Sequence, residues 1–434
     1  MKTHYSYWQL KSKLFAVTTL ALMLSGSIAA GNLNMKKENQ TDTISYVQFK
    51  GVVVDANNNE PLIFATLSIT GINIATVSNS EGEFILKVPK TMVNKSITAS
   101  YIGYKSKEIP ISELRNDKNR IKLEMISVSL SEINVFPKDP YYLISTVLNK
   151  RNENYMNDAA LMTAFYRETI KKGWNYVSLS EAIVEILKQP YNGSRPDMVK
   201  MSKGRKSADY TKLDTLTFKL QGGPYTTLML DIMKNPYLVF TDDLVSYYDF
   251  SLSNITRVND KLIYVLDFKQ REHVDEPLFY GKLYIDTESF AITNASYNLN
   301  VKNKSKATAM FILKKPAGAN VFPTEAAYLV NYRQKNGKWY FGYSRGQVTF
   351  KVDWDKKLFN TNYYTTIEMA VTDWEPSEEK NFKGSERLKM NVIMQDAVSG
   401  FADKEFWGEY NVIEPEQSIE TAIKKIQRSI EKNN

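Results

Sequence analysis

The sequence predicts a mainly β protein, with an N-terminal β-sandwich followed by a curved antiparallel β-meander domain that contains a few helices. Residues 49–123 consist of alternating β-branched and aromatic runs, which Asp, Asn, Gly and Pro turns interrupt. Residues 244–350 repeat this pattern, and their short connections allow only adjacent antiparallel pairing. Helical periodicity is confined to a few segments, of which residues 139–156 and 416–432 are the longest.

The first 30 residues have the three parts of a secretory signal peptide. Lysines precede an apolar run over residues 14–24, and small residues follow, with cleavage expected after Ala29 or Ala30. This apolar run is shorter than the roughly 20 residues that a helix needs to cross a bilayer, so an uncleaved anchor is the less favoured alternative. Residues 31–45 are polar and aperiodic, and we expect them to form a flexible tether.

The composition limits the cellular compartments in which the protein can be expected, but it does not identify a class of ligand. The 434 residues are enough for two or three domains, and the formal charge of +8 suits anionic glycans, lipid headgroups and nucleic acid alike. The absence of cysteine excludes disulfides, thiol catalysis and thiolate metal sites. An exported chain without disulfides favours the bacterial periplasm, or the periplasmic face of the outer membrane.

Residues 46–124 carry a set of spaced motifs that points to one kind of domain. The motif residues are Gly51, Asp55, Glu60-Pro61-Leu62, Ala65-Thr66, Gly71, Glu81-Gly82-Glu83-Phe84 and Tyr101-Ile102-Gly103-Tyr104. With these residues the region resembles the carboxypeptidase-regulatory-like (transthyretin-like) domain of exported Bacteroidota proteins, which implies an accessory interaction module without zinc ligands. It departs from the bacterial pattern at Ile63-Phe64, where Pro-Gly is usual, and at Ser78-Asn79-Ser80.

Residues 125–138 are expected to link this sandwich to a second, β-rich domain over residues 139–434. A helix is predicted to begin there, with Asp139 as its N-cap and Pro140 at its first helical position. Strands are predicted over residues 161–170 and 176–187, and a short helix over residues 225–234.

The meander after residue 244 is predicted as a series of hairpins. Residues 247–253 should pair with 261–268, and residues 281–286 with 290–299; further strands are expected at residues 307–313, 325–333 and 338–350. The hairpin over residues 281–293 resembles one in lipoprotein-carrier-like half-barrels, which implies a sheet wrapped around a helix.

The last helix, residues 416–432, is predicted from a single apolar face. Ile419, Ile423, Ile426 and Ile430 recur at helical spacing. We expect this face to pack on the sheet rather than on a membrane surface, because it lacks aromatic residues.

No motif for catalysis or metal binding emerges. A zinc peptidase needs about three protein ligands, largely histidine, and only His4 and His273 exist. The stretch around His273 is charged and no Gly-x-Ser-x-Gly occurs, so a serine triad is not indicated. Residues 55–60 resemble half a calcium loop but lack its glycine, and they are better interpreted as an Asx-rich turn. Carboxylate pairs occur at Asp242-Asp243, Asp353/Asp355 and Glu378-Glu379.

Two sets of surface residues are candidates for contacts or modification. Residues 197–214 are basic and predicted to form a loop, in which Lys200, Lys203, Arg205 and Lys206 could contact an anionic surface. Export and the lack of a groove-reading motif argue against nucleic acid. Asp-Thr-apolar tripeptides resemble Bacteroidota O-glycosylation sites, which would place sugars on Thr43 and Thr215.

These observations predict a non-catalytic binding or scaffold protein of the cell envelope, without a cofactor. The sandwich would be an interaction module, and the β-rich domain would hold an apolar ligand or a partner, which could be an envelope protein, a glycan or a lipid. Two alternatives remain open. Residues from about 161 onward could form an outer-membrane β-barrel, or a carboxylate pair could serve a hydrolase.

Overall fold

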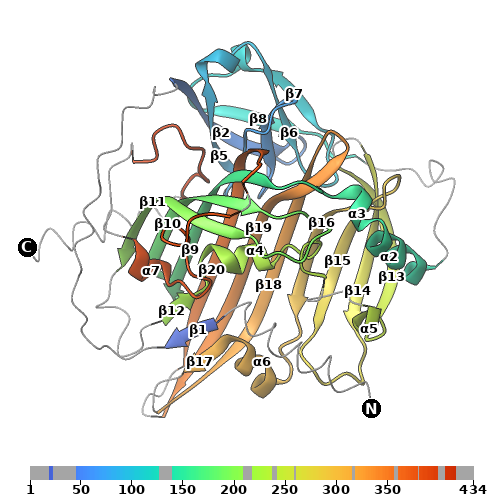
Figure 1. Ribbon diagram of the computed structural model, residues 1–434, viewed down its shortest axis with the longest axis vertical. Coiled ribbons are helices and arrows are strands. Elements are labelled where there is room, and N and C mark those ends of the chain that lie inside the picture. Colours follow the sequence, from blue (N-terminus) through green and yellow to red (C-terminus); the bar gives the residue numbers. More distant parts are fainter. Residues whose placement is uncertain are drawn as a thin grey trace, which may run out of the picture.

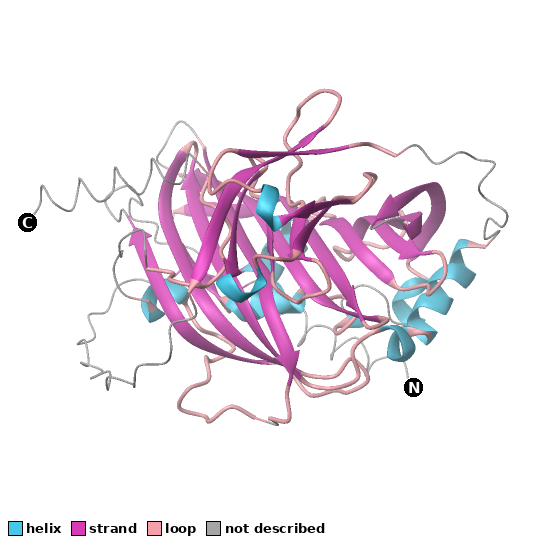
Figure 2. Ribbon diagram, turned by 90° about the horizontal axis from the view of Figure 1, so that it is seen from above, coloured by secondary structure: helices cyan, strands magenta, loops and turns pink. Residues whose placement is uncertain are grey.

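The fold is mainly β, as the sequence predicts. The computed structural model describes residues 19–22, 45–126, 139–208, 218–236, 242–258, 261–314, 318–355, 360–379, 381–398 and 406–416. Figure 1 shows a small β-sandwich at the top of the molecule and one large sheet below it. In the view from above, the few short helices contrast with the long strands of this sheet (Figure 2). No helix in the described ranges is both long and apolar enough to cross a membrane.

The N-terminal sandwich consists of two small sheets around a shared apolar core. Phe49, Leu67, Phe84 and Ile121 are among the side chains buried between them. One sheet has the order β5-β2-β8 and the other β4-β3-β6-β7. The strands are β2 (Tyr46–Asp55), β3 (Thr66–Ile69), β4 (Ala75–Val77), β5 (Glu83–Pro89), β6 (Ser96–Ser100), β7 (Lys107–Pro110) and β8 (Asn119–Leu123), with short 3₁₀ turns at Lys90–Met92 and Ile111–Glu113.

One pair of neighbouring strands in the sandwich is parallel. Strand β8 runs parallel to β2, with Gly51 opposite Asn119. The chain reaches β8 by crossing over from the other sheet, and a parallel pair of strands requires such a crossover. Asp55 forms the Asx turn that the sequence predicts, since its Oδ1 accepts hydrogen bonds from the backbone N–H groups of Asn57 and Asn58.

The large sheet has ten strands in the order β11-β10-β9-β20-β19-β18-β16-β15-β14-β13. Every neighbouring pair in it is antiparallel. Strands β11 and β13 are the two edges of this sheet. The described residues therefore do not form a closed barrel, which the outer-membrane alternative requires. The strands are β9 (Ala160–Lys172), β10 (Asn175–Lys188), β11 (Met198–Ala208), β13 (Tyr248–Val258), β14 (Lys261–Gln270), β15 (Phe279–Asp286), β16 (Ile292–Leu299), β18 (Ala319–Lys335), β19 (Lys338–Trp354) and β20 (Thr361–Pro376).

The predicted hairpins β13–β14 and β15–β16 are confirmed. Two other predictions are wrong. The predicted loop over residues 197–214 is strand β11 as far as Ala208, because it pairs along its length with β10. The predicted strand over residues 307–313 is instead helix α6 (Lys304–Phe311) followed by β17 (Ile312–Lys314). The side chain of Asn303 caps α6 by accepting a hydrogen bond from the Lys306 N–H.

The helices are short and line one face of the large sheet. Helix α2 (Pro140–Asn149) begins with the Asp139 side chain accepting from the Tyr141 N–H, and α3 (Arg151–Asn154) follows it. Helix α4 (Pro224–Met229) is shorter than the predicted residues 225–234, because Pro224 starts it and the chain leaves the helix at Leu230. Figure 1 shows α4 crossing β19 and β20. Helices α5 (Asp242–Val245) and α7 (Met394–Ala397) are single turns. The predicted helix over residues 416–432 lies outside the described residues, except for its first residue.

The two faces of the large sheet bury different layers. We call the helix face the side on which Ala164, Tyr166 and Phe350 join the main core with the helices. The opposite side, on which Phe165 and Tyr343 contact the sandwich, is the sandwich face. The division follows from the two-residue period of a strand, which sends successive side chains to opposite sides.

A small third sheet lies beside the helix face. Strand β1 (Thr19–Leu22) pairs antiparallel with β12 (Phe218–Gln221) and parallel with β17. Strand β1 comes from the apolar run of the predicted leader.

Candidate ligand pocket on the helix face

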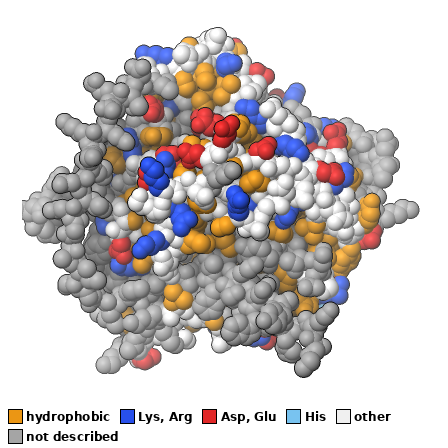
Figure 3. Space-filling model, in the orientation of Figure 1, with side chains coloured by type: hydrophobic (Ala, Val, Ile, Leu, Met, Phe, Trp, Pro, Cys, Tyr) orange, Lys and Arg blue, Asp and Glu red, His pale blue; other side chains and the backbone are white. Residues whose placement is uncertain are grey.

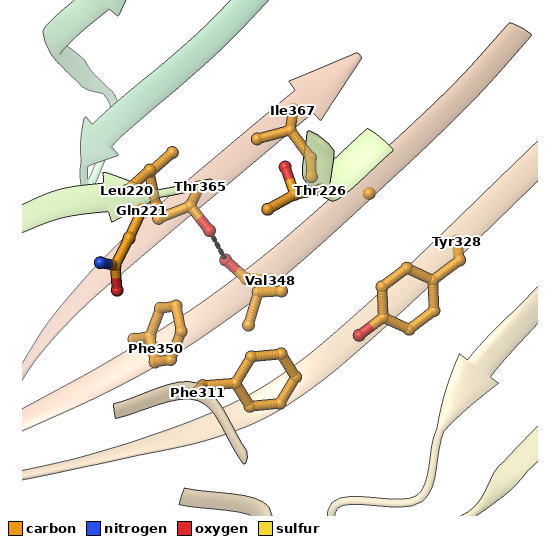
Figure 4. Close-up of a pocket in the computed structure, with 10 residues that line it drawn as sticks. Leu220, Gln221, Thr226, Phe311, Tyr328, Val348, Phe350, Thr365 and Ile367 are labelled. Carbon is orange, nitrogen blue, oxygen red and sulfur yellow. Dashed lines mark hydrogen bonds between the residues drawn. The ribbon is translucent and has the colours of Figure 1, made fainter. Parts of the chain in front are cut away.

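An apolar pocket lies between the large sheet and the elements that cover its helix face. Its floor is formed by residues of β18, β19 and β20, and its cover by residues of β12, α4 and α6 (Figure 4). The residues around it are Leu220, Gln221, Thr226, Phe311, Tyr328, Gly346, Val348, Phe350, Thr365 and Ile367.

The lining is aromatic and aliphatic, with few polar groups. The rings of Phe311 and Phe350 meet edge to face with their centroids 5.9 Å apart. The Thr365 hydroxyl donates to the backbone carbonyl of Val348 at 3.1 Å, so this polar side chain is satisfied by the sheet (Figure 4). The pocket therefore suits an apolar group much better than a charged one.

The pocket is closed down in this conformation. Its cavity volume is about 40 Å³. A drug-sized ligand needs a pocket of roughly 300–1,000 Å³. A ligand of that size could enter only if the cover moved.

The cover is made of short segments rather than of a continuous layer. Strand β12 has four residues and β17 has three, and β1 joins them. On its other side, the cover is tied to residues 390–398 by a hydrogen bond from the Gly222 N–H to the Val392 carbonyl at 2.7 Å. Lys219 and Asp396 add a partly exposed ion pair at 2.9 Å. Short strands with few hydrogen bonds open at low free-energy cost.

A buried carboxyl group lies next to the pocket on the same face. Glu168 is opposite Ile367 in the pairing of β9 with β20, and its Oε2 accepts a hydrogen bond from the Tyr166 hydroxyl at 2.8 Å. Burial raises the pKa of Glu168 to about 7, against the hydrogen bond of Tyr166, which favours the ionised form.

A second polar cluster on the helix face is separate from the pocket. The Lys188 ammonium lies 2.6 Å from Asp197 and 2.7 Å from Asp231, with the lysine side chain fully buried. Asp231 also accepts hydrogen bonds from the hydroxyls of Tyr191 and Tyr332, each at 2.8 Å. Every member of this cluster has a partner within the fold, which is the arrangement of a structural network.

The sandwich face carries a third charged cluster. Arg167 bridges Glu181 at 2.8 Å and Glu368 at 3.3 Å, and Arg205 contacts Glu181 at 2.7 Å. The guanidinium of Arg167 also donates to the Ile413 carbonyl at 2.8 Å. The cluster therefore holds residues 406–416, which we call the strap, between the large sheet and the sandwich.

The strap also contributes apolar side chains to this contact. Trp407 packs edge to face against Phe165, with centroids 5.6 Å apart. Phe64 of the sandwich stacks on Tyr343 of the sheet at 5.5 Å. These contacts, with the buried charges, join the two domains through one extended interface.

The predicted anionic-contact residues lie along β11, where the structure gives them partners. Lys200 pairs with Glu185 at 2.9 Å, and Lys203 donates to the Phe406 carbonyl. Arg205 is buried in the third cluster, and Lys206 donates to the Gln395 carbonyl at 2.5 Å. The structure does not bring the four into one open cationic site. Thr43 and Thr215 lie outside the described residues.

The other candidate residues do not meet at the pocket. His273 is exposed, and Asp353 and Asp355 are exposed near the end of β19. Among the described residues, no three His, Cys, Asp or Glu side chains gather closely enough to hold a metal ion.

Sequence reasoning missed the pocket, Glu168 and Lys188. Glu181 and Lys188 both stand inside a run of mostly apolar residues on β10, and charges in such positions indicate burial with partners. The pocket left no comparable signal, because its lining residues come from six separate segments.

Three solved structures match parts of this chain at low sequence identity and low TM-score. A DUF1329 family protein from Desulfovibrio piger is 11% identical and covers 57% of this chain and 99% of its own, with a TM-score of 0.26. A putative outer membrane lipoprotein-sorting protein domain from Vibrio parahaemolyticus is 8% identical, covering 57% and 94%, with a TM-score of 0.24. Lipovitellin is 6% identical, covering 58% and 29%, with a TM-score of 0.27. Similarity at this level carries no information about a ligand.

The comparison with sequences concerns the N-terminal region. No curated protein sequence matches the chain. Residues 49–135, in contrast, match a known domain family, and they include the motifs from Gly51 to Tyr104 that the sequence analysis singled out. The predicted resemblance is confirmed there: residues 49–135 are a CarboxypepD_reg-like domain.

Proposed function

We propose that this protein is a non-catalytic binding protein of the cell envelope that holds an apolar ligand on the helix face of its large sheet. The observation that carries the proposal is the apolar pocket around Val348 and Phe350, which only short segments cover. The sandwich would act as an interaction module, rigidly joined to the sheet through the strap. A pocket with an apolar lining and a movable cover is typical of ligand-binding proteins.

The position of β1 supports an opening step. Strand β1 is the element that joins β12 to β17 across the pocket cover. Removal of the leader, which the signal-peptide pattern predicts, would leave β12 and β17 without their shared partner. The backbone hydrogen bonds that β12 and β17 make with β1 would then be lost, and the pocket could widen toward the size of a ligand.

The envelope location rests on the sequence. The basic, apolar and small-residue parts of the first 30 residues direct export, and the absence of cysteine fits a bacterial periplasm. The proposal that the protein has no catalytic role rests on the scattered positions of His273 and the carboxylate pairs. Hydrolysis in a glycosidase or esterase panel that Asp353→Asn abolishes would overturn it.

Native mass spectrometry of the exported full chain tests the ligand. We expect an apolar adduct that organic extraction releases. Val348→Phe should fill the pocket and remove the adduct, whereas Val93→Phe, at an exposed position of the sandwich, should retain it. An exported protein that is folded but carries no adduct, and that binds no fluorescent fatty acid after leader removal, would contradict the proposal.

A further inference from the structure

The tip of the β9–β10 hairpin presents a tryptophan to solvent. The side chain of Trp174 is 98% exposed, the largest value among the exposed large hydrophobic residues of the described chain. Strand β9 ends at Lys172 and β10 begins at Asn175, so the turn has two residues. Gly173 has a φ of +57°, which glycine adopts without strain at the first position of such a turn. The tryptophan is therefore held outward by a tight turn between two long strands.

Trp174 stands at the rim of an open hollow. This hollow has a volume of about 430 Å³ and is lined by Trp174, Lys351, Asn360 and Tyr364, among others. Lys351 also lines a larger hollow of about 1030 Å³. On β19, Lys351 lies between Phe350 and Val352, which both point to the helix face. Lys351 thus belongs to the sandwich face, opposite the apolar pocket.

The larger hollow combines cationic and aromatic side chains. Five cationic side chains and three carboxylates line it, and one of the carboxylates, Asp249, is paired with Arg271 at 3.2 Å. The Lys304 ammonium lies 4.5 Å from the centroid of the Phe322 ring, and Tyr280 is 46% exposed. The other charged residues at this hollow are Lys269, Lys302, Lys351, Glu272 and Glu325.

We propose that this surface docks the protein on an anionic lipid bilayer. We call it the docking surface and define it as Trp174, Lys269, Tyr280, Lys302, Lys304 and Lys351. Tryptophan and tyrosine favour the interface between headgroups and acyl chains, and lysines near a bilayer are attracted by anionic lipids. The docking surface provides both, and the tight turn spares Trp174 the entropy cost of ordering a loop.

A bilayer accounts for these features better than a soluble anionic polysaccharide does. A sugar chain would occupy the hollows and stack on their walls, as Tyr280 and Phe322 permit. The bound sugar chain would leave Trp174, at the tip of its hairpin, exposed to water. A bilayer can take up this ring while the lysines behind it contact the headgroups. None of the residues that line the apolar pocket belongs to the docking surface, so docking and ligand binding involve separate residues.

Vesicle flotation with the exported full chain tests the docking surface. We expect the protein to float with phosphatidylcholine vesicles that contain phosphatidylglycerol, and to remain largely unbound with phosphatidylcholine alone. Trp174→Ala should weaken binding by about tenfold, because the loss of one inserted large apolar side chain has about this effect. Replacing Lys302 and Lys351 together by glutamine should weaken it by about 25-fold, or about fivefold for each lysine.

Matched substitutions elsewhere separate docking from general effects of charge or hydrophobicity. Tyr142→Ala removes another aromatic side chain, which is 67% exposed on α2, and should leave binding unchanged. Lys122→Gln removes an exposed lysine of the sandwich and should also leave it unchanged. Equal losses for control and test variants would overturn the proposal. So would binding to dextran sulfate without binding to anionic vesicles, which would favour a polysaccharide instead.

Discussion

The Lys188 ammonium lies 2.7 Å from a carboxylate oxygen of Asp231, and both side chains are fully buried. Asp197 approaches the same ammonium at 2.6 Å, and two tyrosine hydroxyls complete the shell of Asp231. The attraction of the two carboxylates raises the pKa of Lys188 although burial alone would lower it. The cluster thus holds a charged lysine in the core, between β10 and the segment that follows α4.

Lys188→Met should lower the free energy of unfolding by about 3–5 kcal/mol, because it leaves two carboxylates without their buried partner. Urea denaturation at neutral pH measures this loss. The matched control is Lys282→Met, which breaks a half-exposed pair with Asp267 and should hardly change the midpoint. If the two variants lost equal stability, the buried cluster would contribute no more to the free energy of unfolding than the half-exposed pair does.

The local elements of this fold could be predicted where the chain carries its own signal. Alternation and turn residues were sufficient for β13–β14, and the Asp139-Pro140 start was sufficient for α2. Strand β11 was missed because lysines and a glycine dominate its sequence. Its pairing depends on partners such as Glu185 and Glu181 on β10, which no local pattern reveals. Residues 307–311 are helical rather than extended because the Asn303 side chain caps α6 at its N-terminus.

The candidate site depends on contacts that are distant in sequence. Phe311 and Phe350 meet in the pocket although 39 positions separate them in the printed chain. Strand β20 was not predicted, and it places Ile367 opposite Glu168 of β9, about 200 positions earlier. Strand pairing over such distances in the sequence determines which side chains line the pocket, and it cannot be predicted from composition.

Trp407 should be essential to the interface between the domains. It is 5% exposed and packs on Phe165, and Trp407→Ala should cost about 3–5 kcal/mol through lost burial and a cavity. Trp174→Ala makes the same change at a 98% exposed site and should alter stability by at most about 0.5 kcal/mol. Chemical denaturation of the two variants gives the comparison. A similar stability for both would mean that the strap does not anchor the sandwich to the sheet.

Stability should depend on pH through Glu168. Its pKa is raised from 4.5 to about 7 in the fold, so the folded chain keeps this proton over a range in which the unfolded chain has lost it. The contribution of Glu168 to the free energy of unfolding is fully present below about pH 4.5 and is lost as the pH rises through about 7. This free energy changes by roughly 3 kcal/mol over that range. Glu168→Gln should remove this part of the pH dependence. Tyr166→Phe, which deletes a hydrogen bond to the ionised form, should extend the window above pH 7.

Unfolding free energies measured across this range, for the native chain and both variants, check the expectation. The difference between the native chain and Glu168→Gln is the informative quantity, because other titrating groups cancel in it. A difference that stays constant from pH 4 to about 8 would show that the pKa of Glu168 is the same in the folded chain as in the unfolded chain, and it would contradict the expectation.

Gly51→Ala should destabilise the sandwich because β2 and β8 approach each other closely at this position. A Cβ on residue 51 would lie 2.2 Å from the backbone carbonyl oxygen of Asn119, and backbone in a paired strand cannot move aside cheaply. We expect a loss of about 1–3 kcal/mol, the usual cost of overpacking. Gly384→Ala is the control, since a Cβ there meets nothing within 4 Å. Thermal unfolding of the two variants distinguishes them, and an equal melting temperature would mean that β8 is not tightly paired with β2. A loosened β8 should also expose residues 119–126 to proteolysis before the large sheet is cut.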